Sequence, residues 1–276
     1  MTIGVANAEP AGLGAAPTRI ELQGAANVRD VGGYRTYDGE KVKSAKIIRS
    51  DALGKLTDAD VTKLGTLKIQ TVIDLRTASE IQVLGADRLP SGVPLVSRPI
   101  SDNGMFDKMN QAIGSKDPVK QQELLGDGKA EQIMADMYRS FFNSDSLAKF
   151  GQSVKDLAGT GTATLYHCTA GKDRTGWLTY VTLRAVGVPE TTARQDYLLS
   201  NQYRAAADKA LRDQLKAAGI MQNPDLLIPL QEVRDDYLDA AVSQLESDFG
   251  DFGKFLTEGL GLDAATILKL RKNLVS

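Results

Sequence analysis

The chain has 276 residues, of which 42% are hydrophobic and 25% charged, as in an ordinary globular protein. This composition excludes a collagen, a coiled coil and a chain that is disordered throughout. The 33 lysine and arginine residues against 35 acidic ones leave a formal charge of -2, so no general positive field favours nucleic acid or an anionic membrane. Any anion site must be local, and we expect no nucleic-acid partner.

Residues 1–19 are considered apart from the fold. Ala6-Asn7-Ala8 before Glu9-Pro10 resembles the cleavage region of a secretory signal, although the basic part and the long apolar part are missing. The segment fits either a flexible Ala/Gly-rich tail or the remnant of an export signal, and the second interpretation favours a secreted or periplasmic location over the cytoplasm. Since no run of 18 apolar residues occurs, we expect no membrane-spanning helix, while transient contact with a membrane surface stays open.

Residues 20–276 are expected to form a single α/β domain with a central sheet flanked by helices. Short runs rich in β-branched residues predict strands at 46–48, 71–75, 95–96 and 162–166. Apolar residues at helical spacing predict a helix from Thr57 or Asp58 to Leu64 and another over 174–186. Beyond Pro189 the pattern is almost entirely helical, and these helices should cover one side of the sheet: 190–201, 203–218, 229–249, 252–260 and 264–274.

The stretch 101–142 differs in composition, with methionines and phenylalanines placed around a polar Gly/Lys-rich centre: Met105, Phe106, Met109, Met134, Met137, Phe141 and Phe142. We interpret it as an insertion made of mobile helices. For Met137, Phe141 and Phe142, ordinary core packing at i, i+4 spacing is the favoured interpretation.

The most informative segment runs from Tyr166 to Gly176 and reads Tyr-His-Cys-Thr-Ala-Gly-Lys-Asp-Arg-Thr-Gly. A cysteine ends a predicted strand, five residues follow, and Arg174 opens a predicted helix. Such a loop can turn successive backbone N–H groups inward, and the helix adds the positive end of its dipole, which makes a cradle for one phosphate. Arg174 can hold two phosphate oxygens in a fork. The expected phosphate-binding residues are Cys168, Thr169, Ala170, Gly171, Lys172, Asp173 and Arg174.

Cys168 is the predicted nucleophile, because this cradle favours its thiolate at neutral pH. His167 precedes it in a strand, where neighbouring side chains point to opposite faces, so a papain-like pair of thiolate and imidazolium is not expected. His167 is predicted instead to hydrogen-bond the loop backbone. With one cysteine and one histidine, the chain can form no internal disulfide and has too few soft ligands for a zinc site. We expect no metal and no cofactor.

Breaking a phosphate ester also needs a proton donor for the leaving group. Asp173 lies beside the thiolate and the bound dianion, two negative neighbours that favour its protonated form, so it is the preferred general acid. Asp102, on the loop after the strand at 95–96, is the rival. The hydroxyl of Thr175 can hydrogen-bond the cysteine sulfur and ease its release when water attacks the phosphorus.

The segment His-Cys-x5-Arg-Thr-Gly resembles the signature of the cysteine-dependent protein tyrosine phosphatase superfamily, in the form typical of its bacterial tyrosine/lipid phosphatase branch. Shorter segments resemble the same branch in the same order, at 27–34, 49–51, 74–76, 196–201 and 237–274. The resemblance implies a tyrosine-phosphatase-like sheet flanked by helices, a helical C-terminal part and a lid around 101–142. It also implies hydrolysis of phosphotyrosine and often of phosphoinositides, with some activity on phosphoserine or phosphothreonine.

By the same resemblance, the partner is a phosphorylated protein or a phosphoinositide, and the chain is expected to be a monomer. Lys172 has a counterpart in the tensin-homologue lipid phosphatases, where the added cation helps to bind further ring phosphates. The alternative, that Lys172 only neutralises Asp173, stays open. Structural ion pairs that support the loop are expected at Arg29-Asp30 and between Asp74 and Arg76.

Three functions are compared. The first is a phosphomonoesterase that works through a cysteinyl-phosphate, with Cys168, Arg174, Asp173 or Asp102, and Thr175 in the roles described. The second is a catalytically silent phosphate-recognition module, against which the presence of all these groups together argues. Thiol redox chemistry would need no Arg174 and usually a resolving cysteine, which the sequence lacks. On helix 203–218, the basic residues Arg204, Lys209 and Arg212 are expected on a solvated face, with attraction of anionic substrates near the mouth of the site as the alternative.

Overall fold

A six-stranded sheet lies at the centre of the computed structural model, which describes residues 17–159 and 161–276. Its strands are, in spatial order, β1 (Thr18–Arg19), β2 (Arg29–Asp30), β3 (Ile47–Ser50), β6 (Ala163–His167), β4 (Ile69–Asp74) and β5 (Leu95–Ser97). The last four run parallel and are the four strands that the β-branched runs predict. The α/β fold is thereby confirmed.

Strands β1 and β2 are antiparallel additions at one edge of the sheet. Neither was predicted, because a strand of two residues has no periodicity to detect. Of the expected N-terminal tail, residues 1–16 lie outside the described residues, whereas Thr18 and Arg19 belong to β1. The sheet therefore begins before the expected boundary at residue 20.

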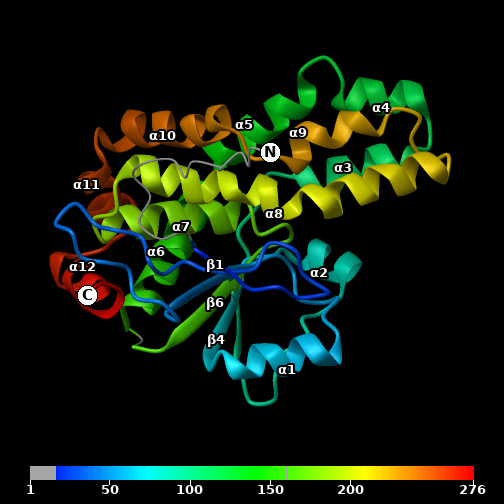
Figure 1. The fold of residues 1–276 in the computed structure, drawn as a ribbon. Helices are drawn as coiled ribbons and strands as arrows, with labels where there is room; N and C mark the ends of the chain where they lie inside the picture. Colours follow the sequence, from blue (N-terminus) through cyan, green and yellow to red (C-terminus); the bar gives the residue numbers. More distant parts are fainter. Residues whose placement is uncertain (1–16, 160) are drawn as a thin grey trace, which may run out of the picture.

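Helices lie on both sides of the sheet (Figure 1). On one side, α1 (Asp58–Thr66) packs Leu64 against Ile48, Val72 and Leu165 of the strands. On the other side, α6 (Ser144–Gly159), α7 (Arg174–Ala185) and α8 (Glu190–Ala217) build the larger core. The three inner parallel strands β3, β6 and β4 are therefore largely buried on both faces, whereas β5 at the edge is mostly exposed. The carboxyl ends of the parallel strands meet at one edge, where an α/β sheet places its ligands.

The stretch 101–142 forms α3 (Met105–Ser115), α4 (Pro118–Leu125) and most of α5 (Lys129–Ser140). Met137 and Phe141 are fully buried, and Phe142 packs against Trp177 of α7, so the predicted core role of these residues is confirmed. Helix α2 (Ala78–Leu84), which was not predicted, begins at a capping box formed by Thr77 and Glu80.

The C-terminal part is helical as predicted, with different boundaries. Helix α8 is continuous where two helices were predicted, and α10 (Asp235–Phe249) begins later than residue 229. The late start has a physical reason: the Asn201 side chain donates to the Val233 carbonyl and accepts from its N–H, which holds the chain extended before α10. The remaining elements are η1 (Pro224–Leu227), α9 (Ile228–Gln231), α11 (Phe252–Lys254), η2 (Phe255–Gly259) and α12 (Ala264–Leu274). Among the described residues, no helix is long and apolar enough to span a membrane.

Candidate active site

The loop 168–173 joins the carboxyl end of β6 to the first residue of α7. Cys168 is buried at its start, and Arg174 opens the helix. Gly171 adopts φ +64°, and a Cβ there would lie 2.3 Å from the carbonyl oxygen of Ser50. Only glycine fits this turn, because any side chain would collide with the backbone of β3.

The loop carbonyls point outward and are bonded by neighbouring elements. The Gly171 oxygen accepts from Asn27 Nδ2 at 2.9 Å and from Arg49 Nη2 at 2.7 Å, and the Ala170 oxygen accepts from Asn27 at 3.1 Å. Within the part of the chain that the structure describes, no backbone N–H of residues 169–173 donates a hydrogen bond. These donors are available for an anion, which is the arrangement that the sequence predicts.

Arg174 is oriented by a buried carboxylate that the sequence analysis did not identify. Its Nη1 donates to Glu80 Oε2 at 2.8 Å and to the carbonyl oxygens of Leu75 and Ile100, while Nη2 donates to Glu80 Oε1. The guanidinium Nε is buried and has no partner among the described residues. Glu80 thus holds the end of the guanidinium, and the edge formed by Nε and the second N–H of Nη2 remains for an anion.

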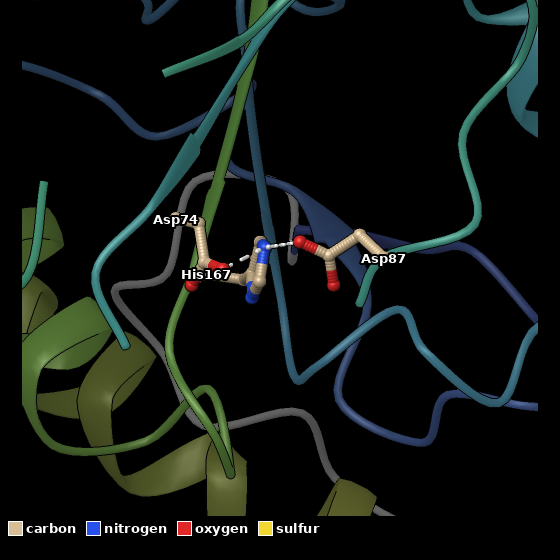
Figure 2. Close-up of side chains that lie close together, drawn as sticks. All are labelled: Asp74, Asp87 and His167. Atoms are coloured by element: carbon tan, nitrogen blue, oxygen red, sulfur yellow. Dashed lines mark hydrogen bonds and ion pairs between the residues drawn. The ribbon is translucent and has the colours of Figure 1, made fainter. Parts of the chain in front are cut away.

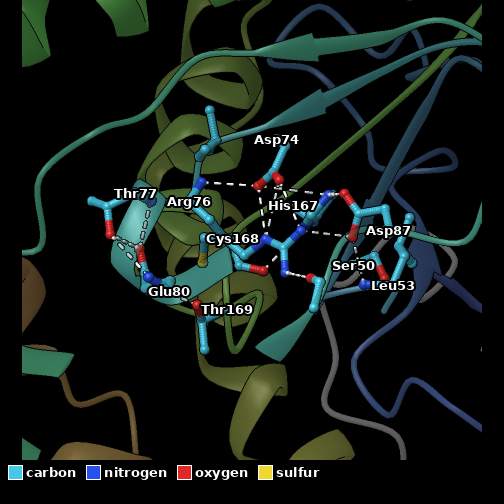
Figure 3. A network of polar contacts seen from close by, with 12 residues as sticks. Ser50, Leu53, Asp74, Arg76, Thr77, Glu80, Asp87, His167, Cys168 and Thr169 are labelled. Atoms are coloured by element: carbon cyan, nitrogen blue, oxygen red, sulfur yellow. Dashed lines mark hydrogen bonds and ion pairs between the residues drawn. The ribbon is translucent and has the colours of Figure 1, made fainter. Parts of the chain in front are cut away.

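The electrostatics favour the charged forms of this pair. Burial acts against ionisation of Glu80, but the hydrogen bonds and charge of Arg174, with further bonds from Thr169 and the Thr77 backbone, lower the pKa of Glu80 to about 2. Burial also disfavours the Arg174 cation, yet Glu80 and the charge of Cys168 raise the pKa of Arg174 above its usual value. Figure 3 shows Glu80 reaching Thr169 of the loop from α2. The Thr-x-x-Glu capping box is the sequence signal for this residue.

Asp74, Asp87 and His167 bring their ligand atoms within 4.8 Å of one another (Figure 2). The guanidinium of Arg76 bonds both carboxylates, Asp74 Oδ2 and Asp87 Oδ1, each at 2.9 Å. A metal ion would have to displace this cation. The cluster is better described as a buried ion network centred on Arg76, and it contains the expected pair of Asp74 and Arg76.

His167 connects this network to the loop. Its Nε2 lies 3.0 Å from Asp87 Oδ2 and its Nδ1 lies 3.1 Å from the carbonyl oxygen of Cys168. Both neighbours are oxygen acceptors, so a ring nitrogen that carries a proton can donate to either. Burial would raise the pKa of Asp87, but the hydrogen bond and charge of His167 and the charge of Arg76 lower it. The expected hydrogen bond from His167 to the loop backbone is present.

Asp173 and Lys172 form a buried ion pair at the end of the loop, with Lys172 Nζ 2.9 Å from the carboxylate. Lys172 also donates to the carbonyl oxygen of Glu232 at 3.3 Å. Of the two interpretations of Lys172, this geometry favours neutralisation of Asp173 over binding of further phosphates. Tyr138 of α5 donates to Asp173 Oδ1 at 3.0 Å.

Asp102 and Thr175 have surroundings different from those expected. Both oxygens of Asp102 accept backbone hydrogen bonds at the start of α3, from Gly104 at 3.0 Å and Phe106 at 2.8 Å. Thr175 Oγ1 is buried and makes no hydrogen bond with any described residue, so its predicted bond to the Cys168 sulfur is absent from this structure. Asp102 therefore acts here as a helix cap.

The comparison with known proteins is decisive at this point, because the sequence model described as the tyrosine phosphatase family matches residues 20–276. The chain belongs to the tyrosine phosphatase family. The phosphatase is 28% identical over 272 residues to the triple specificity protein phosphatase PtpB of Mycobacterium tuberculosis, covering 91% of this chain and 97% of that one. It is 28% identical over 244 residues to a candidate tyrosine-protein phosphatase of Cupriavidus necator, covering 87% and 84%. A crystal structure of TpbA from P. aeruginosa aligns with 74% of this chain and 95% of that chain, at 16% identity and a TM-score of 0.32. The activity class is that of a protein tyrosine phosphatase, a hydrolase of phosphorylated substrates.

A pocket of about 730 Å³ opens onto Cys168 of the phosphatase. Apolar side chains from three segments form much of its wall: Ile20, Leu22, Met105, Phe106, Met109 and Leu211. Arg204 of α8 also lines the pocket and pairs with Asp51 and Asp208. Burial acts to lower the pKa of Arg204, but these two carboxylates and the charge of Cys168 raise it above its usual value. For Arg204 the solvated position is therefore wrong and the alternative position near the site is the observed one, because α8 presents this residue to the loop, whereas Lys209 is exposed as expected.

The predicted ion pair at Arg29-Asp30 is also wrong. Arg29 and Arg49 lie opposite each other in β2 and β3, and both pair with Asp196 of α8, at 3.0 and 2.7 Å. Asp30 instead accepts from the backbone of Gly32 at 2.9 Å and of Ala45. The Arg29 and Arg49 side chains still support the loop of the phosphatase, through Asn27 and Gly171 respectively.

Proposed function

We propose that this phosphatase hydrolyses phosphomonoesters through a phosphocysteine at Cys168. The thiolate attacks phosphorus, the bond from phosphorus to the leaving oxygen breaks, and Asp173 gives its proton to that oxygen. Water then attacks the phosphorus, the phosphorus–sulfur bond breaks, and Asp173 takes a proton from the water. The thiolate is restored, and one ester and one water become one alcohol and one phosphate.

The donors that surround Cys168 carry this proposal. The backbone N–H groups of 169–173 make no hydrogen bond within the described residues, and Arg174 keeps its Nε edge for an anion. Three equatorial oxygens of a transferring phosphoryl group need this set of donors. Because Glu80 holds the guanidinium before the substrate binds, the transition state gains these contacts without reorganisation of Arg174.

Asp173 is the proposed acid in preference to Asp102. Asp173 and Cys168 line the same pocket, whereas both oxygens of Asp102 are used in capping α3. Thr175 is proposed to assist the second step, since its buried hydroxyl bonds no other described residue and can turn toward the sulfur as the phosphate leaves.

The proposed substrates are phosphotyrosine in proteins and, beyond it, phosphoinositides and phosphoserine or phosphothreonine. The pocket volume is in the range of small-ligand sites, and its apolar wall suits an aromatic ring. The name of the mycobacterial relative, a triple specificity phosphatase, supports the wider range. Met105, Phe106 and Met109 of α3 line the pocket, which supports a lid role for this part of 101–142.

A turnover panel separates this proposal from a silent phosphate-recognition module. Phosphate release is measured from a phosphotyrosine peptide, a phosphoserine peptide and mono-, bis- and trisphosphorylated inositides, with the wild type and with Cys168→Ser. We expect turnover by the wild type and none by Cys168→Ser, which should still bind vanadate. A wild type that binds vanadate but releases no phosphate would establish the recognition module, and release from the phosphotyrosine peptide alone would limit the substrates to aryl phosphates.

A further inference from the structure

We propose that Tyr138 of α5 is a positioning residue for the carboxyl group of Asp173, and that Tyr197 of α8 orients Tyr138. This inference rests on the proposed function, because it concerns the proton donor of that reaction. It assigns a role in proton transfer to residues of two helices, α5 and α8, that lie outside the loop 168–173. One of them belongs to the stretch 101–142, and the other carries the segment 196–201.

The Tyr138 hydroxyl donates to Oδ1 of Asp173 at 3.0 Å, and both residues are buried. Lys172 is the other hydrogen-bond partner of this carboxyl group among the described residues. An oxygen that accepts a phenol proton is not the oxygen that carries the acid proton. In the carboxylate form, Lys172 Nζ lies 2.9 Å from both oxygens. In the protonated form, Tyr138 keeps Oδ1 as the acceptor and leaves Oδ2 as the oxygen that delivers a proton to the leaving group.

Tyr197 fixes the direction of that bond. Its hydroxyl lies 2.7 Å from the Tyr138 hydroxyl. Because the single proton of Tyr138 points to Asp173, Tyr197 donates to Tyr138 at 2.7 Å in preference to the Arg234 carbonyl oxygen, which lies 3.4 Å away. Burial, with the nearby charge of Asp173, raises the pKa of both phenols well above the usual value, so both keep their protons while the enzyme works. The two rings also pack edge to face, with centroids 6.2 Å apart.

The charged groups near Asp173 show what the phenol adds. Lys172, Arg174 and the Cys168 thiolate belong to the loop itself, and Lys172 Nζ is 2.9 Å from both carboxylate oxygens, so it does not distinguish them. Tyr237 of α10 packs on Tyr138, but its hydroxyl donates to the Pro229 carbonyl. Among the described residues, Tyr138 is therefore the partner that bonds only one of the two carboxylate oxygens of Asp173. Its loss should reduce proton delivery rather than substrate binding.

The test compares Tyr138→Phe with Tyr237→Phe, which removes a hydroxyl from the same aromatic cluster without touching Asp173. Each is assayed on an alkyl phosphate, whose leaving group needs a proton, and on p-nitrophenyl phosphate, whose leaving group needs little. We expect Tyr138→Phe to lower kcat on the alkyl ester about tenfold or more, which is a part of the roughly 100- to 10,000-fold that general acid catalysis contributes. Its KM and its kcat on the nitrophenyl ester should stay within about threefold. Tyr237→Phe should show no such selectivity.

Asp173→Asn and the double variant with Tyr138→Phe complete the design. Adding Tyr138→Phe to Asp173→Asn should cost nothing further on the alkyl ester, since the phenol acts through the carboxyl group. Equal losses on both esters, or selectivity no greater than that of Tyr237→Phe, would overturn the positioning role. If Asp173→Asn itself shows no selectivity, the acid assignment in the proposed function fails instead. Should Tyr138→Phe not fold, Tyr197→Phe is judged by the same criterion.

Discussion

Replacing Glu80 by glutamine should destabilise the protein and disturb Arg174 together. The pKa of Glu80 is lowered from 4.5 to about 2, and at about 1.4 kcal/mol for each pH unit this corresponds to about 3 kcal/mol in favour of the folded carboxylate. Burial opposes this stabilisation of the carboxylate, and the hydrogen bonds and charge of Arg174 are its largest source. Glu80→Gln keeps the shape but leaves a buried cation without its counter-ion, a change of similar cost.

The pH dependence follows from the direction of the shift. Because the folded pKa lies below the unfolded one, the stabilisation is complete above about pH 4.5 and is lost as the pH falls toward 2. By about pH 3, less than half of the difference between the wild type and Glu80→Gln should remain. At pH 7 the melting temperature should fall by about 6–12 °C.

Urea unfolding of the wild type and Glu80→Gln from pH 7 to pH 3 measures this difference, and vanadate affinity reports on Arg174. Glu131→Gln is the matched control, because it removes a carboxylate that pairs with half-exposed Arg234. It should cost less than about 1 kcal/mol. If Glu80→Gln unfolds like the wild type at pH 7, or if the difference between them grows as the pH falls, the reasoning is refuted.

Three further predictions concern the loop and its surroundings. Arg174→Lys should lower kcat/KM on a phosphotyrosine peptide by about 100-fold or more, because an ammonium cannot form the fork, and an unchanged kcat/KM would contradict this. Gly171→Ala should abolish vanadate binding measured by calorimetry, since its Cβ would lie 2.3 Å from a β3 carbonyl oxygen and its φ is +64°. Asp102→Ala should cost about 1 kcal/mol in urea unfolding, as a lost cap does, with equal effects on alkyl and aryl esters; a selective loss on alkyl esters would make Asp102 the acid.

The sequence predicts β3, β4 and β6 well because each is a largely buried run that contains β-branched residues and is bounded by turns. It predicts α12 to the residue, since Asp263 caps its start. The two-residue strands β1 and β2 could not be predicted in this way. Their register nevertheless decides that Arg29 lies opposite Arg49 and shares Asp196 with it. Asp30 is next to Arg29 in the sequence, but in the folded chain Arg29 pairs with Asp196 instead.

In the candidate site, too, residues that are close in the sequence could be predicted, and residues brought together by packing could not. The loop 168–174 is local, so its cysteine, its glycine turn and its arginine can be identified from spacing alone. Glu80 and Tyr138 come from α2 and α5, and their contacts with Arg174 and Asp173 exist only after the helices pack. A capping-box signal marks Glu80 as the start of a helix, but no pattern in the sequence states which cation it meets.

The outward carbonyls of the loop also bear on how the protein is made. Asn27 bonds the carbonyls of Ala170 and Gly171 across 143 and 144 residues of chain. During synthesis at about 5–20 residues per second, Asn27 therefore waits about 7–30 s before its acceptors leave the ribosome. The anion cradle cannot be completed on a nascent chain that ends before β6, so this loop takes its final form only after most of the chain has been made.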